Sequence, residues 1–484
     1  MLIILLLLSP LLSILLSFLT RRSRKMLEAI TVISATVNFV VGVLIVSEVI
    51  RNGTYTFQPF FSLASFEALI LGTTILTGSL VSLHLVGYLR GEQAKKMIGF
   101  SRVRECYVLM HLFLASMFVA ITTTNPIIMW IAIESTTLST VFLVSLFNRT
   151  ADIEAAWKYL IINSIGLLFG LLGTVIFISQ TAQLNNFISW NDLNQASQLI
   201  NPEIAKIAFI FILVGFGTKM GLFPLHTWKP DAYNKAPLPV VALLSGSLLN
   251  IAFFGLLRYK LIIDGTAIGE TFTQSLFILL GTITILFAAV VIFTQTNYKR
   301  LFAYSSIEHA GIMMIGFGFG GIGVYGAILH MIYHAIAKSF MFLVASNIAL
   351  KYSSSKISDV TGMLKTLPIN SILFIIGTLA ILGLPPFGIF YSEFYILSAG
   401  FNFSIPITVG IIVCLSLVMA GVLKAVLPMV FGEVKSELKP GSVNNWVVFP
   451  AVFLAVIFIT LSIYIPEPIL NLIESSSQLF IGDK

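Results

Sequence analysis

Long apolar segments separated by short connections run through the whole sequence. We place candidate spans at residues 2–19, 29–50, 66–89, 106–122, 126–147, 155–179, 203–224, 236–259, 273–295, 301–319, 322–350, 369–396, 404–431 and 446–465. Segments of this length cross a hydrocarbon core of ~30 Å as helices. Only 10% of the 484 residues are charged, far fewer than in soluble domains. We therefore expect an all-α polytopic protein of about 14 transmembrane helices in the lipid bilayer.

The basic residues indicate how these helices are oriented. Odd-numbered connections carry Arg21, Arg22, Arg24 and Lys25; Arg90, Lys95, Lys96, Arg102 and Arg104; Lys299 and Arg300; Lys351, Lys356 and Lys365; Lys435 and Lys439. By contrast, residues 180–202 contain no Lys or Arg. Because cytoplasmic loops are rich in Lys and Arg, we expect both termini outside, in the inner (cytoplasmic) membrane of a prokaryote. The net charge of +7 follows from this asymmetry, so no nucleic-acid partner is expected.

Two opposite charges lie inside apolar segments of the first half. Glu134 is eight residues into its span, or ~12 Å at 1.5 Å per residue, near mid-membrane. Lys219 lies five residues before Pro224, which breaks its span. Charges at such depth cost at least ~2.5–3.5 kcal/mol and are typical of ion or proton paths. At ~4 Å the pair would attract by ~4 kcal/mol, enough for a proton switch. The alternatives are a helix–helix hydrogen bond for Glu134 and a snorkelling lysine.

A second polar row lies in the span 322–350. His330, His334 and Lys338 fall at i, i+4 and i+8, which lines one helix face over ~12 Å. This spacing favours a proton wire, with a metal site at the two histidines or structural polar packing as alternatives. Glu308 and His309, in the preceding span, either extend this wire or cap the start of their helix.

A second broken span resembles the first. Glu393 follows Pro385 and Pro386 by eight and seven residues, much as Lys219 precedes Pro224. Interrupted spans at corresponding places in two halves indicate inverted repeats with an ion site at the breaks.

The remaining candidates are two lysines and two cysteines. Lys158 begins the span 155–179, where it either anchors the helix or supplies positive charge near Glu134. Lys424 is expected to snorkel, with conduction as the alternative. Cys106 and Cys414 are too few to ligate zinc or an iron–sulfur cluster. We therefore expect no metal, cofactor or catalytic residue in this chain.

Several strings carry a family resemblance over about residues 60–435. The strings are WIAIE (130–134), GFGTKMGLFPLHTWKPDAYNKAP (215–237), YSSI (304–307), HMIYHAIAKSFMFL (330–343) and GLPPFGIFYSEF (383–394). They resemble the antiporter-like membrane subunits of respiratory complex I, Mrp-type antiporters and membrane-bound hydrogenases. SSIEH (305–309), EAAWKY (154–159) and PPFGIFYSEF (385–394) are most similar to the F-type subunit of hydrogenase-4 and formate-hydrogenlyase-like complexes.

The resemblance implies an organisation and roles for the polar residues. Helices 1–3 would occupy residues 1–105, two inverted five-helix repeats 106–260 and 270–432, and the last helix with a tail 440–484. Glu134 and Lys219 would form the inner pair, the row from His330 to Lys338 the central relay, and Glu393 the outward carrier.

The resemblance also implies a function and partners. The chain would translocate protons, with Na⁺ as the alternative, inside a redox-driven hydrogenase-type complex. Iron–sulfur clusters and nickel–iron or flavin would belong to a peripheral redox arm, beside further membrane subunits. The alternatives are an Mrp-type subunit without redox coupling and an NADH-quinone oxidoreductase subunit. Many relatives carry Lys or His where this chain has Asn250 or Ser245, so the route between Lys219 and Lys338 stays open.

Overall fold

The computed structural model describes residues 1–484 except 21–22, 181–188, 435–440, 442 and 482–484. Four residues of the orientation prediction, Arg21, Arg22, Lys435 and Lys439, lie outside the described residues.

The first half of the chain contains most of the helices and both strands. They are α1 (Leu2–Leu19), α2 (Arg24–Asn52), β1 (Tyr55–Phe57), β2 (Phe61–Leu63), α3 (Ser65–Ala94), α4 (Phe100–Thr122), α5 (Pro126–Val144), α6 (Thr150–Ser179), α7 (Trp190–Gln195), the 3-10 helix Ser197–Leu199, α8 (Pro202–Met220), α9 (Trp228–Lys235), α10 (Leu238–Leu243), the π-helical turn Leu244–Leu248 and α11 (Leu249–Asp264).

The described secondary-structure elements of the second half are all helices. Its elements are α12 (Thr271–Ile292), α13 (Tyr298–Phe319), α14 (Ile322–Tyr352), α15 (Met363–Thr366), α16 (Pro368–Ile381), α17 (Gly388–Phe403), α18 (Ile405–Phe431), α19 (Asn445–Ile463) and α20 (Glu467–Ile481).

Asparagine caps fix where three of the functional helices begin. The side chains of Asn125, Asn201 and Asn297 accept hydrogen bonds from the first free backbone N–H groups of α5, α8 and α13. In α5 and α8 a proline follows directly, which suits the first helical position because its missing N–H has no partner there.

Among the described residues, eleven helices are long and apolar enough to cross a membrane, with α10 to α11 counted as one helix. This confirms an all-α polytopic membrane protein. The predicted spans 203–224, 301–319 and 369–396 are not among the eleven; they correspond to α8, α13 and the pair α16–α17. The span 203–224 carries Glu203, Lys206 and Lys219, the span 301–319 contains Glu308 and His309 among serines and glycines, and the span 369–396 is interrupted. The count of 14 therefore stays a prediction.

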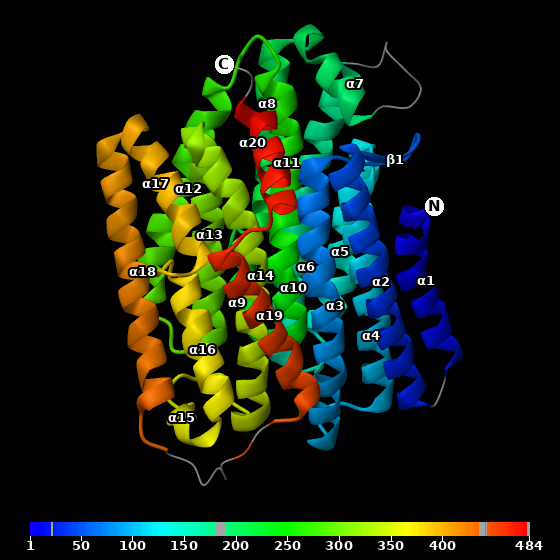
Figure 1. Cartoon of the computed structure of the whole chain (residues 1–484), viewed down its shortest axis with the longest axis vertical. Helices are drawn as coiled ribbons and strands as arrows, with labels where there is room; N and C mark the ends of the chain where they lie inside the picture. The colour runs from blue at the N-terminus through cyan, green and yellow to red at the C-terminus, as the bar shows by residue number, and fades with distance from the viewer. Residues whose placement is uncertain (21–22, 181–188, 435–440, 442, 482–484) are drawn as a thin grey trace.

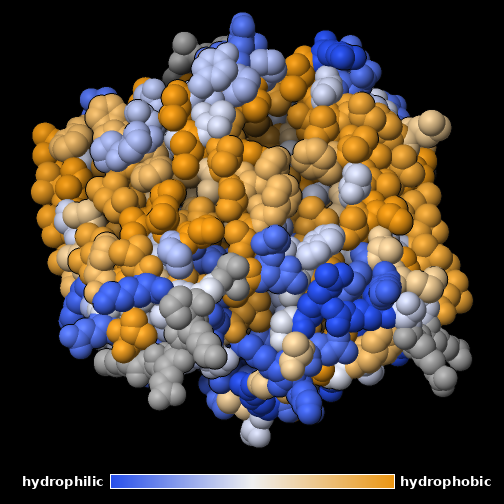
Figure 2. Space-filling view, turned by 60° about the horizontal axis from the view of Figure 1, so that its bottom comes forward, coloured by the Kyte–Doolittle hydropathy of each residue, from blue (hydrophilic) through white to orange (hydrophobic). Residues whose placement is uncertain are grey.

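The helices stand side by side, with α1 and α2 at one edge and α17 and α18 at the other (Figure 1). In the apolar windows of α14 and of Leu238–Asp264 all residues are buried, against 33% in α1, α18 and α19. Hydrophobic side chains form a broad band on the surface, and hydrophilic ones gather at the end that faces the viewer in Figure 2. The polar candidates on α14 are thus insulated from lipid.

Both predicted helix breaks are present. Helix α8 ends at Met220, Gly221 has a left-handed backbone (φ +80°), and the chain passes Pro224 before α9 begins. Helix α16 ends at Ile381, and Gly383 (φ +61°) precedes Pro385 and Pro386 before α17 begins. Each break leaves helix-end carbonyls that a side chain can bind.

Three features were not expected from the sequence: the β1–β2 hairpin, α7 and α20. Residues after the last span were predicted as a tail, but they form α20, whose Phe480 packs against Phe66 of α3 and Phe317 of α13 with ring centroids 5.4 and 5.1 Å apart. Polar residues are interspersed along α20, so a search for long apolar runs passes over it.

Candidate functional site

Lys219 lies in the last turn of α8 and is almost fully buried, with 2% of its surface exposed. Its ammonium donates hydrogen bonds to the hydroxyls of Thr137 (2.7 Å) and Tyr159 (3.2 Å). It also lies 5.3 Å from the centre of the Tyr159 ring, within range of a cation–π interaction. Neutral side chains of α5 and α6 therefore hold this buried charge.

Glu134, on α5, is connected to Lys219 through a hydroxyl. Its carboxylate accepts hydrogen bonds from Ser164 of α6 (2.6 Å) and from Thr137 (3.3 Å). Among the described residues, no direct ion pair joins Glu134 and Lys219. The attraction expected from the sequence was calculated for two charges ~4 Å apart, and the structure does not show such a contact. The reason is that Thr137, one turn beyond Glu134, places its hydroxyl between them. We call Glu134, Thr137, Tyr159, Ser164 and Lys219 the first cluster.

Lys158 lies outside the first cluster. Its exposed ammonium is 2.7 Å from a carboxylate oxygen of Glu154 and 3.6 Å from one of Asp231. It pairs with carboxylates at the helix surface and not with Glu134, so the structure favours the anchoring role of the two considered.

Lys338 has a similar environment in the second half. It is fully buried on α14, and its ammonium donates to the Ser305 hydroxyl on α13 at 2.7 Å. Glu308 follows Ser305 by one turn and is also buried. A lysine bound to a hydroxyl, with a carboxylate one helical turn away, therefore occurs in both halves.

Three side chains continue from this lysine toward α17. His309 Nδ1 lies 2.9 Å from His330 Nε2, and His330 Nδ1 lies 2.9 Å from the Ser392 hydroxyl. Glu393 is adjacent to Ser392 and approaches both imidazoles: one ligand atom from each of His309, His330 and Glu393 lies within 4.8 Å of the others. We call these residues, with His334, Glu308, Ser305 and Lys338, the second cluster.

Some expectations for the second cluster need correction. Helix α13 begins at Tyr298, so Glu308 and His309 lie well inside it and do not cap its start. His330 bonds to His309 of the neighbouring helix, although the sequence suggested His334 as its companion. The rings of His309 and His334 are 5.2 Å apart between centroids, and neither ring nitrogen of His334 has a hydrogen-bond partner among the described residues. The donors nearest to a metal-binding set are thus His309, His330 and Glu393, not the pair His330 and His334.

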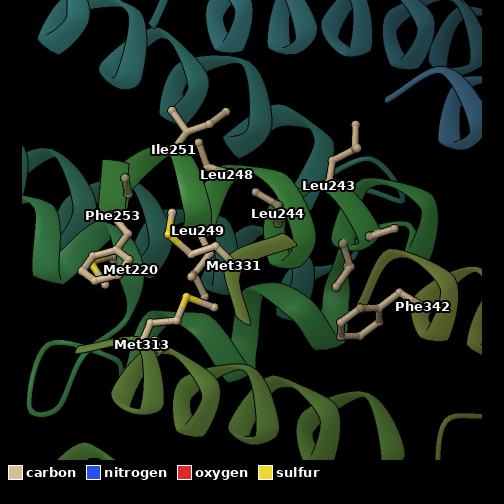
Figure 3. Close-up of a cluster of buried hydrophobic side chains, with 14 of the residues drawn as sticks. Met220, Leu243, Leu244, Leu248, Leu249, Ile251, Phe253, Met313, Met331 and Phe342 are labelled. Carbon is tan, nitrogen blue, oxygen red and sulfur yellow. The ribbon is translucent and has the colours of Figure 1, made fainter. Parts of the chain in front are cut away.

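Ser245 and Asn250, the two positions where many relatives carry Lys or His, lie in the segment α10–α11 and are uncharged. Ser245 shares a hydrogen bond with Ser306 (2.8 Å), and the Asn250 amide donates to the Met331 carbonyl (2.6 Å). Met220 and Met331 belong to one group of buried hydrophobic side chains in this region (Figure 3). These contacts join the two halves but provide no titratable group.

Sequence reasoning missed several residues that the structure adds. Thr137, Tyr159 and Ser164 bind Lys219 or Glu134, and Ser392 binds His330; only the one-turn spacing of Thr137 from Glu134 could have indicated any of them. Another is Lys229 on α9, of which 1% is exposed. It stands between a tryptophan and a proline at the end of a span, where a lysine normally reaches water.

Comparison with known proteins agrees with this architecture. Residues 123–419 match the family described as NADH:quinone oxidoreductase/Mrp antiporter, transmembrane. A hydrogenase-4 component F homolog of Methylacidiphilum infernorum is 34% identical over 386 residues, which are 79% of this chain and 81% of that protein.

Two solved structures share the fold. An archaeal membrane-bound sulfane sulfur reductase has a chain with a TM-score of 0.88 and 23% identity, covering 99% of this chain and 97% of that one. A chain of the Mrp complex from Dietzia sp. DQ12-45-1b has a TM-score of 0.85 and 19% identity, covering 99% of both. With the family match over more than half of its length, this chain belongs to the NADH:quinone oxidoreductase/Mrp antiporter transmembrane family.

Proposed function

We propose that this chain is the proton-translocating membrane subunit of a redox-driven, hydrogenase-type complex related to respiratory complex I. One observation carries the proposal: the same arrangement of lysine, hydroxyl and carboxylate occurs in both clusters. Lys219 bonds to Thr137 beside Glu134, and Lys338 bonds to Ser305 beside Glu308. Nothing but function would offset the cost of keeping these charges inside the membrane.

The hydroxyl of Thr137 gives the first cluster a way to move a proton. Thr137 accepts a hydrogen bond from Lys219 and donates one to Glu134. When the ammonium passes a proton to the hydroxyl oxygen, the hydroxyl releases its own proton to the carboxylate, and the lysine and the glutamate end neutral. A hydrogen bond to a charged group contributes ~1.5–3 kcal/mol, and moving one charge against 100 mV costs ~2.3 kcal/mol. Changes in such bonds are therefore large enough to drive a proton.

The hydrogenase-type assignment rests on the 34% identity to the hydrogenase-4 component F homolog. The chain has two cysteines, too few to hold an iron–sulfur cluster by itself. We place iron–sulfur clusters and nickel–iron or flavin in a peripheral redox arm, beside other membrane subunits. An Mrp-type antiporter without redox coupling is the second candidate, because the Mrp chain covers 99% of this fold.

Purification of the complex distinguishes these candidates. The tagged chain is isolated from its native membranes in mild detergent, and nickel, iron and flavin are assayed. Nickel and iron with a copurifying large subunit support the hydrogenase-type complex. Flavin without nickel favours an NADH-linked complex, and neither metal nor flavin favours the Mrp-type alternative.

Proton transport is measured in inverted membrane vesicles with a dye quenched by acidification. The vesicles receive dihydrogen, formate or NADH in turn, and the uptake missing from a strain that lacks this chain is the chain-dependent proton uptake. We expect Lys219→Ala to abolish it without loss of the assembled complex. Normal uptake by that variant would contradict the proposed function. Repeating the assay with and without Na⁺ identifies the ion.

A further inference from the structure

Lys229 is a buried cation that neither cluster uses. It lies on α9, the short helix after the first break, and α9 packs against α5 and α6 as well as α13. Helices α5 and α6 carry every residue of the first cluster except Lys219, and α13 carries Ser305, Glu308 and His309 of the second. The element that carries Lys229 therefore touches both halves.

The surroundings of Lys229 hold its charge without neutralising it. The ammonium donates to the backbone carbonyl of Met220 at the end of α8 (2.8 Å) and lies 5.7 Å from the centre of the Tyr233 ring. A carbonyl at a helix C-terminus carries partial negative charge, which favours a cation. No carboxylate forms an ion pair with Lys229 in the part of the chain that the structure describes. Without a counter-ion, this lysine is one whose proton neighbouring charges can displace.

The surroundings of Lys229 reach the helix that carries Lys338 and His334. The Tyr233 ring beside the Lys229 ammonium packs edge-on against Phe342 of α14, with ring centroids 5.7 Å apart. Phe342 lies one helical turn beyond Lys338. His334 is fully buried, and neither of its ring nitrogens has a hydrogen-bond partner among the described residues. In the neutral imidazole the nitrogen that carries no hydrogen can accept a proton. Across the same region, α10–α11 places the neutral Ser245 and Asn250, which already bond to Ser306 and Met331.

We propose that Lys229 carries the proton between the two clusters. This inference rests on the proposed function. It supplies the titratable side chain that was missing from the route between Lys219 and Lys338. In the forward step an N–H bond of the Lys229 ammonium breaks and an N–H bond forms on His334, through intervening water. The lysine becomes a neutral amine and the histidine an imidazolium, and Lys229 is recharged from the first cluster.

Substitution of Lys229 tests this role in the whole complex. Lys229→Met keeps the unbranched apolar stem but removes the charge. Lys229→Arg keeps the charge and a donor for the Met220 carbonyl, but arginine does not release its proton in proteins. If Lys229 carries the proton, both variants should lose chain-dependent proton uptake at least tenfold per assembled complex. If Lys229 only stabilises the fold, Lys229→Arg should show near-normal uptake.

Three further variants make the result decisive. Lys206→Met removes a lysine at the exposed start of α8 and is expected to leave uptake unchanged. Asn250→Lys added to Lys229→Met returns an amine to this region, and we expect it to restore a measurable part of the uptake. If Lys229→Met or Lys229→Arg keeps more than a tenth of the uptake while Lys219→Ala abolishes it, this inference is wrong and the proposed function stands. If Lys219→Ala also keeps its uptake, the proposed function itself fails. Should either Lys229 variant not assemble, Lys229→Gln, which retains a donor for Met220, takes its place under the same criterion.

Discussion

Lys219 and Glu134 are bonded to opposite sides of one hydroxyl. Thr137 Oγ1 lies 2.7 Å from the lysine nitrogen and 3.3 Å from a carboxylate oxygen. The pair is therefore coupled through an atom that can both accept and donate a proton, whereas a direct ion pair would lock the two charges together.

Removing that hydroxyl should interrupt transport. We expect Thr137→Val, which has nearly the same shape, to lower chain-dependent proton uptake about tenfold or more, since a hydrogen bond to a charged group contributes ~1.5–3 kcal/mol. Thr137→Ser keeps the hydroxyl and should retain most of the uptake. Vesicle uptake per assembled complex checks both variants, and equal uptake in Thr137→Val and wild type would exclude the bridge.

The contact between α14 and α17 yields a second prediction. Ser392→Ala leaves His330 Nδ1 without its partner at 2.9 Å, and we expect several-fold slower proton uptake. Ser398→Ala on the same helix is the matched control, because the Ser398 hydroxyl donates to the Phe394 carbonyl of its own helix. Initial rates of dye quenching compare the two. Identical rates would show that His330 does not need Ser392.

The second helix break provides a test of how Glu393 is positioned. A Cβ on Gly383 would lie 2.1 Å from a Glu393 carboxylate oxygen, and the residue has φ +61°. Gly383→Ala should therefore destabilise the complex by ~1–3 kcal/mol and displace Glu393. The unfolding temperature of the purified complex and the proton uptake of the vesicles should both fall. Gly410→Ala on α18, where a Cβ meets nothing within 4 Å, should lower neither.

The orientation prediction needs an independent experiment. We expect both termini outside because the odd-numbered connections carry the basic residues. Alkaline phosphatase fused to the C-terminus folds only outside the cytoplasm, so the full-length fusion should be active. Green fluorescent protein at the same position should stay dark when it is exported unfolded. The reverse pattern would place the basic connections outside.

The buried charges and the helix breaks could be predicted because each depends on a local rule. Lys219, Glu134 and Lys338 stand out in apolar runs, and Pro224 and Pro385 cannot continue a helix. Their partners could not be predicted, because Tyr159 and Ser392 are ordinary residues until tertiary packing brings them to a lysine and a histidine. Likewise, His309 became the partner of His330 only through the packing of α13 on α14.

Lys229 and α20 escaped prediction for different reasons. Lys229 has the sequence context of a lysine at a membrane surface, and the break between α8 and α9 folds it inward. Helix α20 has polar residues interspersed with apolar ones, so hydropathy alone does not find it. In both cases tertiary structure, and not local preference, decides the environment.

The burial of the polar row on α14 has an electrical consequence. His330, His334 and Lys338 are spread over ~12 Å of a helix that crosses a core of ~30 Å. Because no lipid or bulk solvent reaches them, a proton that passes along this row crosses ~40% of the core and works against the same share of the membrane voltage. At 100 mV that share is ~0.9 kcal/mol. The row therefore acts as a voltage-dependent step, whose rate should fall as the opposing potential across the bilayer rises.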